Sequence, residues 1–311
     1  MSKITVALIA GGSSPERDIS LAGGEQVFKA LDKSRYEIIR YDPRTDLKRL
    51  VTEAARLDVA LVILHGAGGE DGSLQGMLDL LKIPYQCSGV LGSALAANKL
   101  AAKQIYIQAG LPTAAYAVLD KKRPPGADAL EDHIKRLGMP VVVKPVNGGS
   151  SLGMSIVHDA SRLARAVDKA LECDDCVILE AFVKGRELTG AVLGNDNLEA
   201  LPVVEIIPGE DYAFFDYEAK YTPGATREVC PADIDKALTE KVQDYACRAH
   251  RALFCKGCSR TDMIADGGSL YLLETNTIPG MVPTSLLPLA AEAAGISFGA
   301  LLDRLITQSL D

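Results

Sequence analysis

Short apolar runs alternate with amphipathic segments along the N-terminal third of the chain. The pattern predicts three strands and three helices, with strands at 4–10, 36–41 and 59–64 and helices at 20–31, 47–56 and 73–81. Strands that are separated by helices pair in parallel, and the helices cover the faces of the sheet. The N-terminal third is therefore expected to be an α/β domain built on a parallel sheet.

Two glycine-rich loops, 11–17 and 65–72, follow the first and third predicted strands. Ligands bind parallel sheets at the carboxyl ends of their strands, and backbone amides beside a helix N-terminus suit a small carboxylate or phosphate. The first loop lacks the G-x-G-x-x-G spacing of dinucleotide-binding folds. A dinucleotide-dependent oxidoreductase is therefore a distant alternative.

A hairpin is predicted near the C-terminal end. Residues 259–264 and 269–274 alternate between apolar and polar side chains as strands do. The Asp-Gly-Gly sequence at 266–268 indicates a turn between them. We expect a three-residue loop, 267–269, to connect the two strands.

With that loop, Asp262 lies directly opposite Glu274, and Asn276 shares the face of Glu274 because side chains alternate along a strand. Three oxygen donors would then converge, as they do around a hard divalent cation such as magnesium. Arg260 projects from the same face, and a cation beside a cationic side chain suggests an anionic substrate, most simply a nucleotide phosphate. For the hairpin alone, a solvated charged face is the alternative interpretation.

Lys144 ends a short apolar strand at 140–145, and a segment rich in glycine and serine, 146–153, follows at once. Backbone amides and hydroxyls of such a segment can surround phosphate oxygens. A tight hairpin turn would explain the glycines but not the lysine, and the order differs from a Walker P-loop because the lysine precedes the glycines. A helix predicted at 93–109, which carries Lys99, lies before this strand.

The rest of the chain adds a strand, an irregular segment and three helices. The strand is predicted at 177–183, the irregular segment at 208–230 and the helices at 234–252, 286–294 and 298–310. Irregular segments of that length in a compact domain are usually lids or binding loops.

Composition narrows the class of protein. The chain has 311 residues, enough for two or three domains, and its net charge of -8 argues against a nucleic-acid binder. No apolar run approaches the roughly 20 residues of a membrane span. We therefore expect a cytoplasmic protein with neither a nucleic-acid nor a membrane partner.

The seven cysteines are an odd number, and they are scattered through a chain large enough to fold without disulfides. Two pairs have C-x-x-C spacing, Cys173/Cys176 and Cys255/Cys258, and together they resemble a four-thiolate zinc site. The pairs are far apart in the sequence, and the second leads directly into the predicted hairpin. Reduced, ordinary cysteines are therefore the preferred interpretation.

Taken together, these segments resemble the D-alanine–D-alanine ligases of the ATP-grasp superfamily, over nearly the whole chain and in the right order. The residues that carry the resemblance are 15–20, 65–76, 88–91, 144–145 with 149–151, 216–221, Arg260 with Asp262, Glu274 with Asn276, 279–281 and 285–286. The resemblance implies an α/β fold with a three-domain ATP-grasp architecture. Its N-terminal parallel-sheet (pre-ATP-grasp) domain would span 1–97, the central domain 98–182 and the C-terminal, metal-binding domain 183–311.

The resemblance also implies an ADP-forming reaction in two steps, which serves peptidoglycan precursor synthesis. ATP phosphorylates the carboxylate of one D-alanine, and the amine of a second D-alanine attacks the acyl phosphate to give D-alanyl-D-alanine. Phosphoryl transfer between anions needs alignment and charge neutralisation. By resemblance, two Mg²⁺ ions, for which Mn²⁺ can substitute, are held by Asp262, Glu274 and Asn276, and ATP is bound by Lys99, Lys144, Ser151, Glu180, Val183, Glu187 and Lys220.

For the amino acids, the resemblance implies a set of catalytic and substrate-binding residues. The catalytic set is Glu16, Ser150, Tyr221, Arg260, Gly280 and Ser285, and the substrate-binding set is His65, Glu16, Ser285 and Leu286. Glu16 would pair with the ammonium of the first D-alanine, and Arg260 with the amide of Gly280 would stabilise the oxyanion of the tetrahedral intermediate. Ser285 with the amide of Leu286 would bind the carboxylate of the second D-alanine. The implied assembly is a homodimer.

Apart from the resemblance, three of these residues have simpler interpretations: a packed histidine for His65, a helix-start carboxylate for Glu16 and a solvated helix lysine for Lys99. The sequence departs from the family pattern at several positions, which are Gln86-Cys87, Asn98, Cys258-Ser259 and Thr284. Asn98 stands where aspartate is common, and Thr284 stands where histidine is frequent. The departure at Thr284 leaves open a ligase with a different second amino acid. A catalytically silent nucleotide-binding protein is the alternative from another class.

Overall fold

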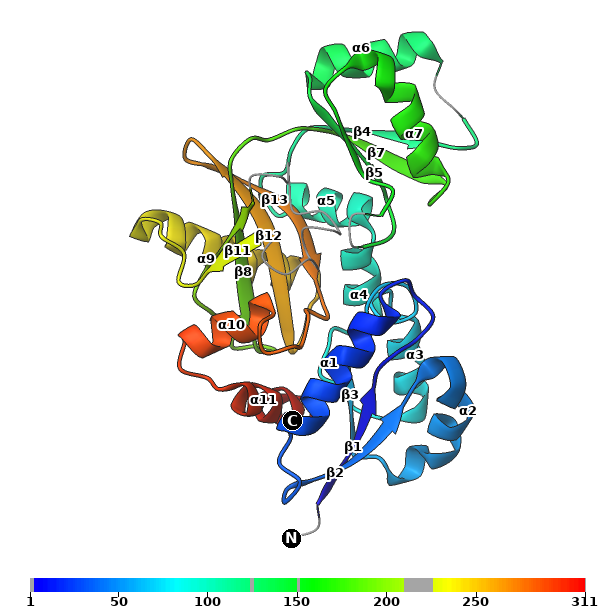
Figure 1. The fold of residues 1–311 in the computed structure, drawn as a ribbon, viewed down its shortest axis with the longest axis vertical. Helices are drawn as coiled ribbons and strands as arrows, with labels where there is room; N and C mark the ends of the chain where they lie inside the picture. The colour runs from blue at the N-terminus through cyan, green and yellow to red at the C-terminus, as the bar shows by residue number, and fades with distance from the viewer. Residues whose placement is uncertain (1–2, 124–125, 150–151, 210–225, 311) are drawn as a thin grey trace.

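The computed structural model describes residues 3–123, 126–149, 152–209 and 226–310. Within these residues the chain forms three sheets, each with its own helices (Figure 1). The N-terminal sheet lies at the bottom of Figure 1, the central sheet at the top, and the third sheet at the left between them. The predicted α/β class is confirmed, while the domain boundaries at 97/98 and 182/183 stay predictions.

The N-terminal sheet is parallel, as predicted, and has the strand order β2-β1-β3. The carboxyl ends of β1 and β3 lead into the two glycine-rich loops, which therefore lie at the same edge of the sheet. The elements of this region are β1 (Ile4–Ile9), α1 (Arg17–Ala30), β2 (Tyr36–Tyr41), α2 (Pro43–Glu53), η1 (Ala54–Arg56), β3 (Val59–Val62) and α3 (Ser73–Leu81).

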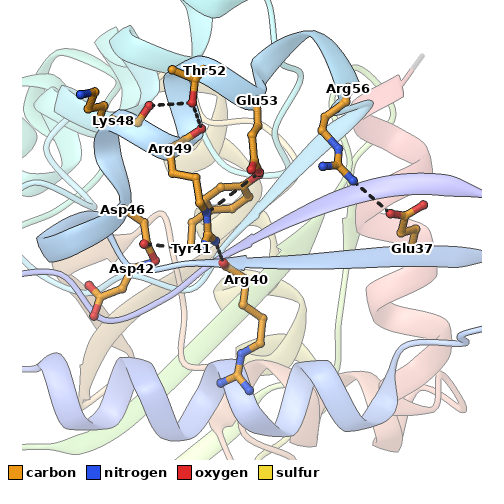
Figure 2. Close-up of polar contacts among 10 residues, drawn as sticks. All are labelled: Glu37, Arg40, Tyr41, Asp42, Asp46, Lys48, Arg49, Thr52, Glu53 and Arg56. Carbon is orange, nitrogen blue, oxygen red and sulfur yellow. Dashed lines mark hydrogen bonds and ion pairs between the residues drawn. The ribbon is translucent and has the colours of Figure 1, made fainter.

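Polar contacts hold α2 and the turn after it against β2 (Figure 2). Asp42, the residue before α2, caps the helix with its side chain. The hydroxyl of Tyr41 donates a hydrogen bond to Glu53 at 2.5 Å, and Arg56 pairs with Glu37 at 3.3 Å. The first contact fixes the end of β2 and the second its beginning. Just beyond β2, the Asp42 carboxylate accepts from the amide of Gly12 in the first glycine-rich loop.

The single helix predicted at 93–109 is wrong, because the chain forms two helices there, α4 (Val90–Ala97) and α5 (Lys99–Gln108). Asn98 between them is extended, and its side chain accepts a hydrogen bond from the amide of Ala101 at 2.9 Å. An asparagine that caps the second helix in this way ends the first. The break places Lys99 at the first residue of α5.

The central sheet is antiparallel and has the strand order β4-β7-β5-β6. Its apolar side chains form a core separate from those of the other two sheets. The elements are β4 (Tyr116–Asp120), α6 (Ala127–Leu137), β5 (Val141–Pro145), β6 (Ser155–Val157), η2 (Ala160–Arg162), α7 (Leu163–Leu171) and β7 (Cys176–Ala181).

The third sheet has the order β11-β10-β8-β12-β13, with β9 paired to β8. Helix α9 (Lys236–Ala252) packs on this sheet. The strands are β8 (Arg186–Leu193), β9 (Glu199–Ala200), β10 (Val204–Pro208), β11 (Thr226–Val229), β12 (Cys258–Asp266) and β13 (Ser269–Asn276). Strands β10 and β11 cover the two ends of the segment predicted to be irregular.

The last two helices, α10 (Leu286–Ala293) and α11 (Phe298–Leu310), join the N-terminal and third sheets in one core. Leu287 and Leu305 are fully buried there together with Leu8 of β1. Among the described helices, none is long and apolar enough by itself to cross a membrane; α10 and α11 meet that test only as a pair bent by 103°.

All seven cysteines belong to the described residues and are free thiols, as predicted.

Candidate active site

The β12–β13 hairpin differs from the predicted hairpin in its turn. Asp266 pairs with Ser269, so the turn has the two residues Gly267 and Gly268, and the predicted three-residue loop is wrong. Both glycines have positive φ, 53° and 91°, as a two-residue turn that follows the twist of the strands requires. An irregularity in the pairing between residues 262 and 263 then shifts the register by one residue.

That shift restores the predicted arrangement of side chains. Asp262 is paired with Glu274, and Arg260 is paired with Asn276. The guanidinium of Arg260 donates two hydrogen bonds to the Asp262 carboxylate, at 2.9 and 2.8 Å. The Asp262 carboxylate also accepts from the Asn276 amide at 3.1 Å and from the Thr189 hydroxyl at 2.6 Å.

Arg260 stays protonated in this site. Burial alone would lower its pKa, but the Asp262 carboxylate, with Glu274 and Glu70, raises that pKa above the ordinary value for arginine. Only 12% of its side chain is exposed, on the wall of a cavity. A buried guanidinium of this kind is suited to stabilising negative charge that develops on a bound substrate.

The hairpin residues match the donor set of a magnesium site. Two carboxylates, Asp262 and Glu274, and the side-chain amide of Asn276 supply oxygen ligands of the type that Mg²⁺ prefers. In the described part of the chain, no three His, Cys, Asp or Glu side chains are grouped so as to hold a metal ion by themselves. Mg²⁺ sites in which one or two carboxylates act together with the phosphates of a nucleotide are common in proteins.

The start of α5 is held against the glycine-rich segment that follows β5. The ammonium of Lys99 contacts the carbonyl oxygen of Gly148 and lies 3.9 Å from a carboxylate oxygen of Glu274. The side-chain amide of Asn98 donates to the side-chain oxygen of Asn147 at 2.9 Å. Lys99 is thus a cavity residue, and the interpretation as a solvated lysine is wrong. Sequence reasoning assigned no role to Asn147, although its place between Lys144 and the glycines was a signal.

A cavity of about 160 Å³ lies between the central and third sheets. Its walls are largely apolar, with Val142, Ile156 and Phe182 on one side and Ile264 and Leu273 on the other. The described residues that were predicted to bind ATP all line it: Lys99, Lys144, Glu180, Val183 and Glu187. Ser151 and Lys220, also predicted to bind ATP, lie outside the described residues.

Glu180 lies between two lysines in this cavity. Its carboxylate forms ion pairs with Lys103 of α5 and Lys144 of β5, and all three side chains are buried. Burial would raise the pKa of Glu180, but the two ammonium groups hold it below the ordinary value. Glu180 is therefore a carboxylate at neutral pH. No role was predicted for Lys103, because a helix lysine normally indicates a solvated position.

A larger cavity, of about 710 Å³, adjoins the first. Every described residue that was predicted to act on the amino acids lines it: Glu16, His65, Arg260, Gly280, Ser285 and Leu286. Ser150 and Tyr221, the other two predicted catalytic residues, lie outside the described residues. Five residues line both cavities: Lys99, Asn147, Gly148, Gly149 and Glu274. The two cavities therefore share one wall, which carries a lysine and a predicted metal ligand.

Glu16 enters the larger cavity from the loop between β1 and α1. A Cβ atom added to Gly66 or to Gly149 would lie 3.2 or 3.4 Å from a Glu16 carboxylate oxygen, so the side chain extends between these two loops. Within the described residues, it makes no capping hydrogen bond to α1.

An ion pair behind this loop fixes its position. Arg17 pairs with Asp42 at 2.5 Å and also donates to the carbonyl of Gly12 at 2.8 Å. The Asp42 carboxylate in turn accepts from the amide of Gly12 at 3.0 Å. The hydrogen bond from the Arg17 guanidinium lowers the pKa of Asp42 to about 2.

The second glycine-rich loop contributes His65 and a carboxyl group, Glu70, that sequence reasoning missed. The Glu70 carboxylate accepts from the amide of Gly66 at 2.7 Å, and the Glu70 amide donates to the carbonyl of the same residue at 2.9 Å. Burial, with the nearby Glu16 and Glu274 carboxylates, raises the pKa of Glu70 to about 8. Burial also lowers the pKa of His65, which is therefore neutral at pH 7. A carboxyl residue inside a predicted binding loop was the available signal for Glu70.

The loop before α10 closes the far end of the cavity. Gly280 lies against Ser285, because a Cβ atom at Gly280 would fall 2.8 Å from the serine hydroxyl. The Ser285 hydroxyl accepts from the amide of Val282 at 3.4 Å. Ser285 is the last residue before α10, so the amide of Leu286 belongs to the first turn of that helix. Helix N-termini of this kind suit a carboxylate ligand.

Comparison with known proteins identifies the class. The family described as "D-ala D-ala ligase N-terminus" matches residues 42–88, and the family described as "D-ala D-ala ligase C-terminus" matches residues 105–307. D-alanine–D-alanine ligase from Syntrophobacter fumaroxidans is 59% identical over 309 residues, which are 99% of this chain and 98% of that protein. The enzyme of the same name from Desulfotalea psychrophila is 54% identical, over 99% of this chain and 96% of its own.

Solved structures agree with these relatives. D-alanine–D-alanine ligase from Bacillus anthracis, complexed with ATP, has a TM-score of 0.86 at 34% identity and covers 99% of this chain and 97% of its own. The VanG D-Ala:D-Ser ligase from Enterococcus faecalis has a TM-score of 0.85 at 30% identity, with 99% and 100% covered. The fold is that of the ATP-grasp ligases. The chain belongs to the D-alanine–D-alanine ligase family.

Proposed function

We propose that this protein joins two molecules of D-alanine to D-alanyl-D-alanine, with hydrolysis of ATP to ADP and phosphate, in the synthesis of peptidoglycan precursors. The observation that carries the proposal is the wall shared by the two cavities. A nucleotide in the smaller cavity and an amino acid in the larger one would meet at Lys99, Gly148, Gly149 and Glu274. That geometry supports transfer of a phosphoryl group from the nucleotide to the amino-acid carboxylate.

In the first step, the lysines neutralise phosphate charge while the donor and acceptor are aligned. Lys144 projects from β5 into the smaller cavity, and Lys99 lies at the shared wall. Asp262, Glu274 and Asn276 would hold two Mg²⁺ ions, with Mn²⁺ as a substitute. These ions would supply further neutralisation of the phosphate oxygens.

The amino acid of the first step is an ammonium carboxylate, and the larger cavity provides a group for each end. Glu16 attracts the ammonium, and His65, which is neutral because burial lowers its pKa, adds no competing charge. The carboxylate is directed to the shared wall, where it becomes an acyl phosphate. A carboxylate is a poor electrophile until one of its oxygens becomes a good leaving group, which is why ATP is required.

In the second step, the amine of the second D-alanine attacks the acyl phosphate. Negative charge then develops on the carbonyl oxygen, and Arg260 with the amide of Gly280 donates to it. Ser285 and the first amide of α10, that of Leu286, bind the carboxylate of this second amino acid. Collapse of the tetrahedral intermediate releases phosphate and the dipeptide.

The proposal is tested by phosphate release from MgATP with D-alanine, L-alanine, D-serine or D-lactate, together with the mass of the product. Release with D-alanine alone, accompanied by the mass of the dipeptide, is the expected result. Tight ATP binding with no release that depends on an amino acid would support a silent nucleotide-binding protein instead.

A ligase for a different second amino acid is a specific alternative. The VanG D-Ala:D-Ser ligase is nearly as similar in structure as the B. anthracis enzyme. In this chain, Thr284 lines the cavity next to Ser285, where a second hydroxyl acceptor or donor would meet a serine side chain. Equimolar D-alanine and D-serine separate the two: the mixed dipeptide as the main product would favour the alternative, and D-alanyl-D-alanine as the main product would exclude it.

We further propose a cytoplasmic homodimer. The seven free thiols and the requirement for ATP support the location. The mass of the protein in solution, measured by light scattering after gel filtration, tests the assembly. A mass that stays at the 33.0 kDa of one chain across the micromolar range would contradict it.

A further inference from the structure

Lys103 is the residue in the described part of the chain whose burial most needs an explanation. It is fully buried, although lysine side chains are almost never buried unless they are paired. Its ammonium contacts the carboxylate of Glu180 and the hydroxyl of Thr113, and lies 3.4 Å from the carbonyl oxygen of Ala114. It also lies 5.3 Å from the centre of the Tyr116 ring. Burial lowers the pKa of Lys103, and the Glu180 carboxylate opposes that effect, so these contacts are what keeps an ammonium at this position.

The Glu180 carboxylate is divided between two lysines, with one oxygen toward Lys103 and the other toward Lys144. The three side chains come from different elements, which are α5, β7 and β5. Glu180 and Lys144 line the nucleotide cavity, whereas Lys103 lies behind them and does not. Lys103 is therefore placed to act on a ligand through its neighbours.

The charges of these three residues explain why a second lysine is present. Two ammonium groups and one carboxylate give a net charge of one positive unit. A single lysine paired with Glu180 would instead form a neutral pair, and its ammonium would be directed to the carboxylate. In a cavity with apolar walls, this extra positive charge attracts an anion strongly, because little water screens the interaction.

We propose that Lys103 is a positioning residue of the nucleotide site, which shares Glu180 with Lys144 so that the Lys144 ammonium stays at the cavity wall and the cluster keeps a net positive charge toward an anionic nucleotide. This inference rests on the proposed function, because it takes the ligand of the smaller cavity to be MgATP. It gives Lys103 a role that a solvated or merely space-filling lysine would not have.

The test is the Lys103→Met variant, which has a side chain of similar length and no charge. Its KM for ATP should rise roughly tenfold or more, the size expected for loss of charge-assisted contacts, while the KM for D-alanine changes less than about twofold. Lys103→Arg, which keeps the charge, should recover most of the ATP affinity. The matched control is Lys121→Met, which removes an exposed lysine 3.5 Å from Asp175 and should leave both constants unchanged.

A double variant tests whether Lys103 acts through Glu180. Lys103→Met leaves a buried carboxylate with one partner, and removing half of such a group can unfold a protein. Lys103→Met/Glu180→Gln removes both charges and leaves Lys144 as the single positive charge, so it should fold. If the inference is correct, its KM for ATP is no higher than that of Glu180→Gln alone. A KM equal to the product of the two separate increases would overturn the inference.

Binding of MgATP measured by calorimetry without D-alanine separates this inference from the proposed function. If the wild-type protein releases no phosphate with D-alanine, the proposed function fails, but the effect of Lys103 on the Kd for MgATP is still measurable. A folded Lys103→Met variant with the wild-type Kd and KM for MgATP would overturn the inference while leaving the ligase activity intact. Equal increases in the KM values for ATP and D-alanine would also overturn it.

Discussion

The two cavities hold their charged side chains in different ways. In the smaller cavity, which is the proposed nucleotide end of the site, Lys144 and Glu180 project from neighbouring strands of one sheet, and both are buried. In the larger cavity, which is the proposed amino-acid end of the site, Glu16 and His65 come from loops that follow β1 and β3, and both are only partly buried. The nucleotide end is therefore fixed by a ladder of backbone hydrogen bonds, and the amino-acid end depends on the contacts that hold its loops.

The balance of charge differs as well. At the nucleotide end, one carboxylate lies between two ammonium groups, so each charge has an opposite partner. At the amino-acid end, the carboxyl groups of Glu16, Glu70 and Glu274 lie near the single guanidinium of Arg260. The first arrangement keeps its ionisation without a ligand and suits an anion. The second is rich in carboxyl groups, which suits an incoming ammonium.

Arg260, which lines the amino-acid cavity beside the shared wall, should give the largest effect. Arg260→Met is expected to lower kcat by about a thousandfold, because it removes a donor to the developing oxyanion and leaves Asp262 without its ion-pair partner. Arg260→Lys keeps the charge but not the two-pronged geometry, and should recover only part of the loss. Steady-state kinetics with both substrates checks this, and a fall in kcat below tenfold would contradict the role of Arg260.

Asp42→Asn should loosen the first glycine-rich loop, 11–17, which carries Glu16. Asparagine still caps α2 but no longer pairs with Arg17. The folded-state pKa of Asp42 is lowered from 3.8 to about 2, so the stability from this pair is present above the ordinary pKa and is lost as the pH falls through about 2. At pH 7 the free energy of unfolding of the variant should be about 1 to 2 kcal/mol lower than that of the wild type.

Urea unfolding at pH 7 and pH 2.5 measures this difference, which should shrink at the lower pH. The same variant should raise the KM for D-alanine without changing the KM for ATP, since only the loop that carries Glu16 is affected. An increase confined to ATP would mean that the two ends are not held independently.

Glu70 probes the carboxyl groups that crowd the amino-acid end. Its folded-state pKa is raised from 4.5 to about 8, so its contribution to stability is complete below the ordinary pKa and is lost as the pH rises through about 8. Without metal or nucleotide, the free energy of unfolding of the wild type should fall by about 1 kcal/mol relative to that of Glu70→Gln between pH 6 and pH 8.5. The fall is small because solvent in the open cavity screens part of the cost of ionising Glu70. Urea unfolding at both values measures it. Glu37→Gln on strand β2 is the control, and equal pH dependence in wild type and Glu70→Gln would refute the assignment.

The sequence predicted those features that depend on local pattern. Alternation of strands and helices was enough for the parallel N-terminal sheet, and alternation within β12 and β13 was enough to place Asp262 and Glu274 on one face. The turn was predicted one residue too long, and the irregularity after Asp262 compensated for that error. An irregularity in strand pairing depends on how neighbouring strands meet, so a single strand sequence does not reveal it.

Features that depend on distant contacts could not be predicted. Lys103 is buried because a carboxylate on β7 and a hydroxyl after α5 reach its ammonium, and its helical position gives no sign of this. The raised pKa of Glu70 comes from the burial of its carboxyl group and from carboxylates on two other segments. The break at Asn98 was missed because α4 and the start of α5 are both rich in alanine and read as one continuous helix.

Asn98 offers the smallest and most selective test of the nucleotide end. Its side-chain oxygen caps α5, and its side-chain nitrogen donates to Asn147. Asn98→Asp keeps the cap, because a carboxylate accepts from the same amide and is favoured at a helix N-terminus, but it has no hydrogen to donate to Asn147. Stability should therefore change by less than about 0.5 kcal/mol, while the KM for ATP rises about twofold to threefold.

Asn147→Ala separates the two contacts of the glycine-rich segment, because Asn147 also bonds to Asp174 through its side chain at 3.1 Å. If the link between α5 and this segment positions the backbone that faces the nucleotide, both variants should raise the KM for ATP. Asn98→Asp should leave the KM for D-alanine unchanged, because Asn98 lines neither cavity, whereas Asn147 lines both. An effect in Asn147→Ala alone would assign the positioning to Asp174, and the nucleotide end would then be held within the central sheet rather than across to α5.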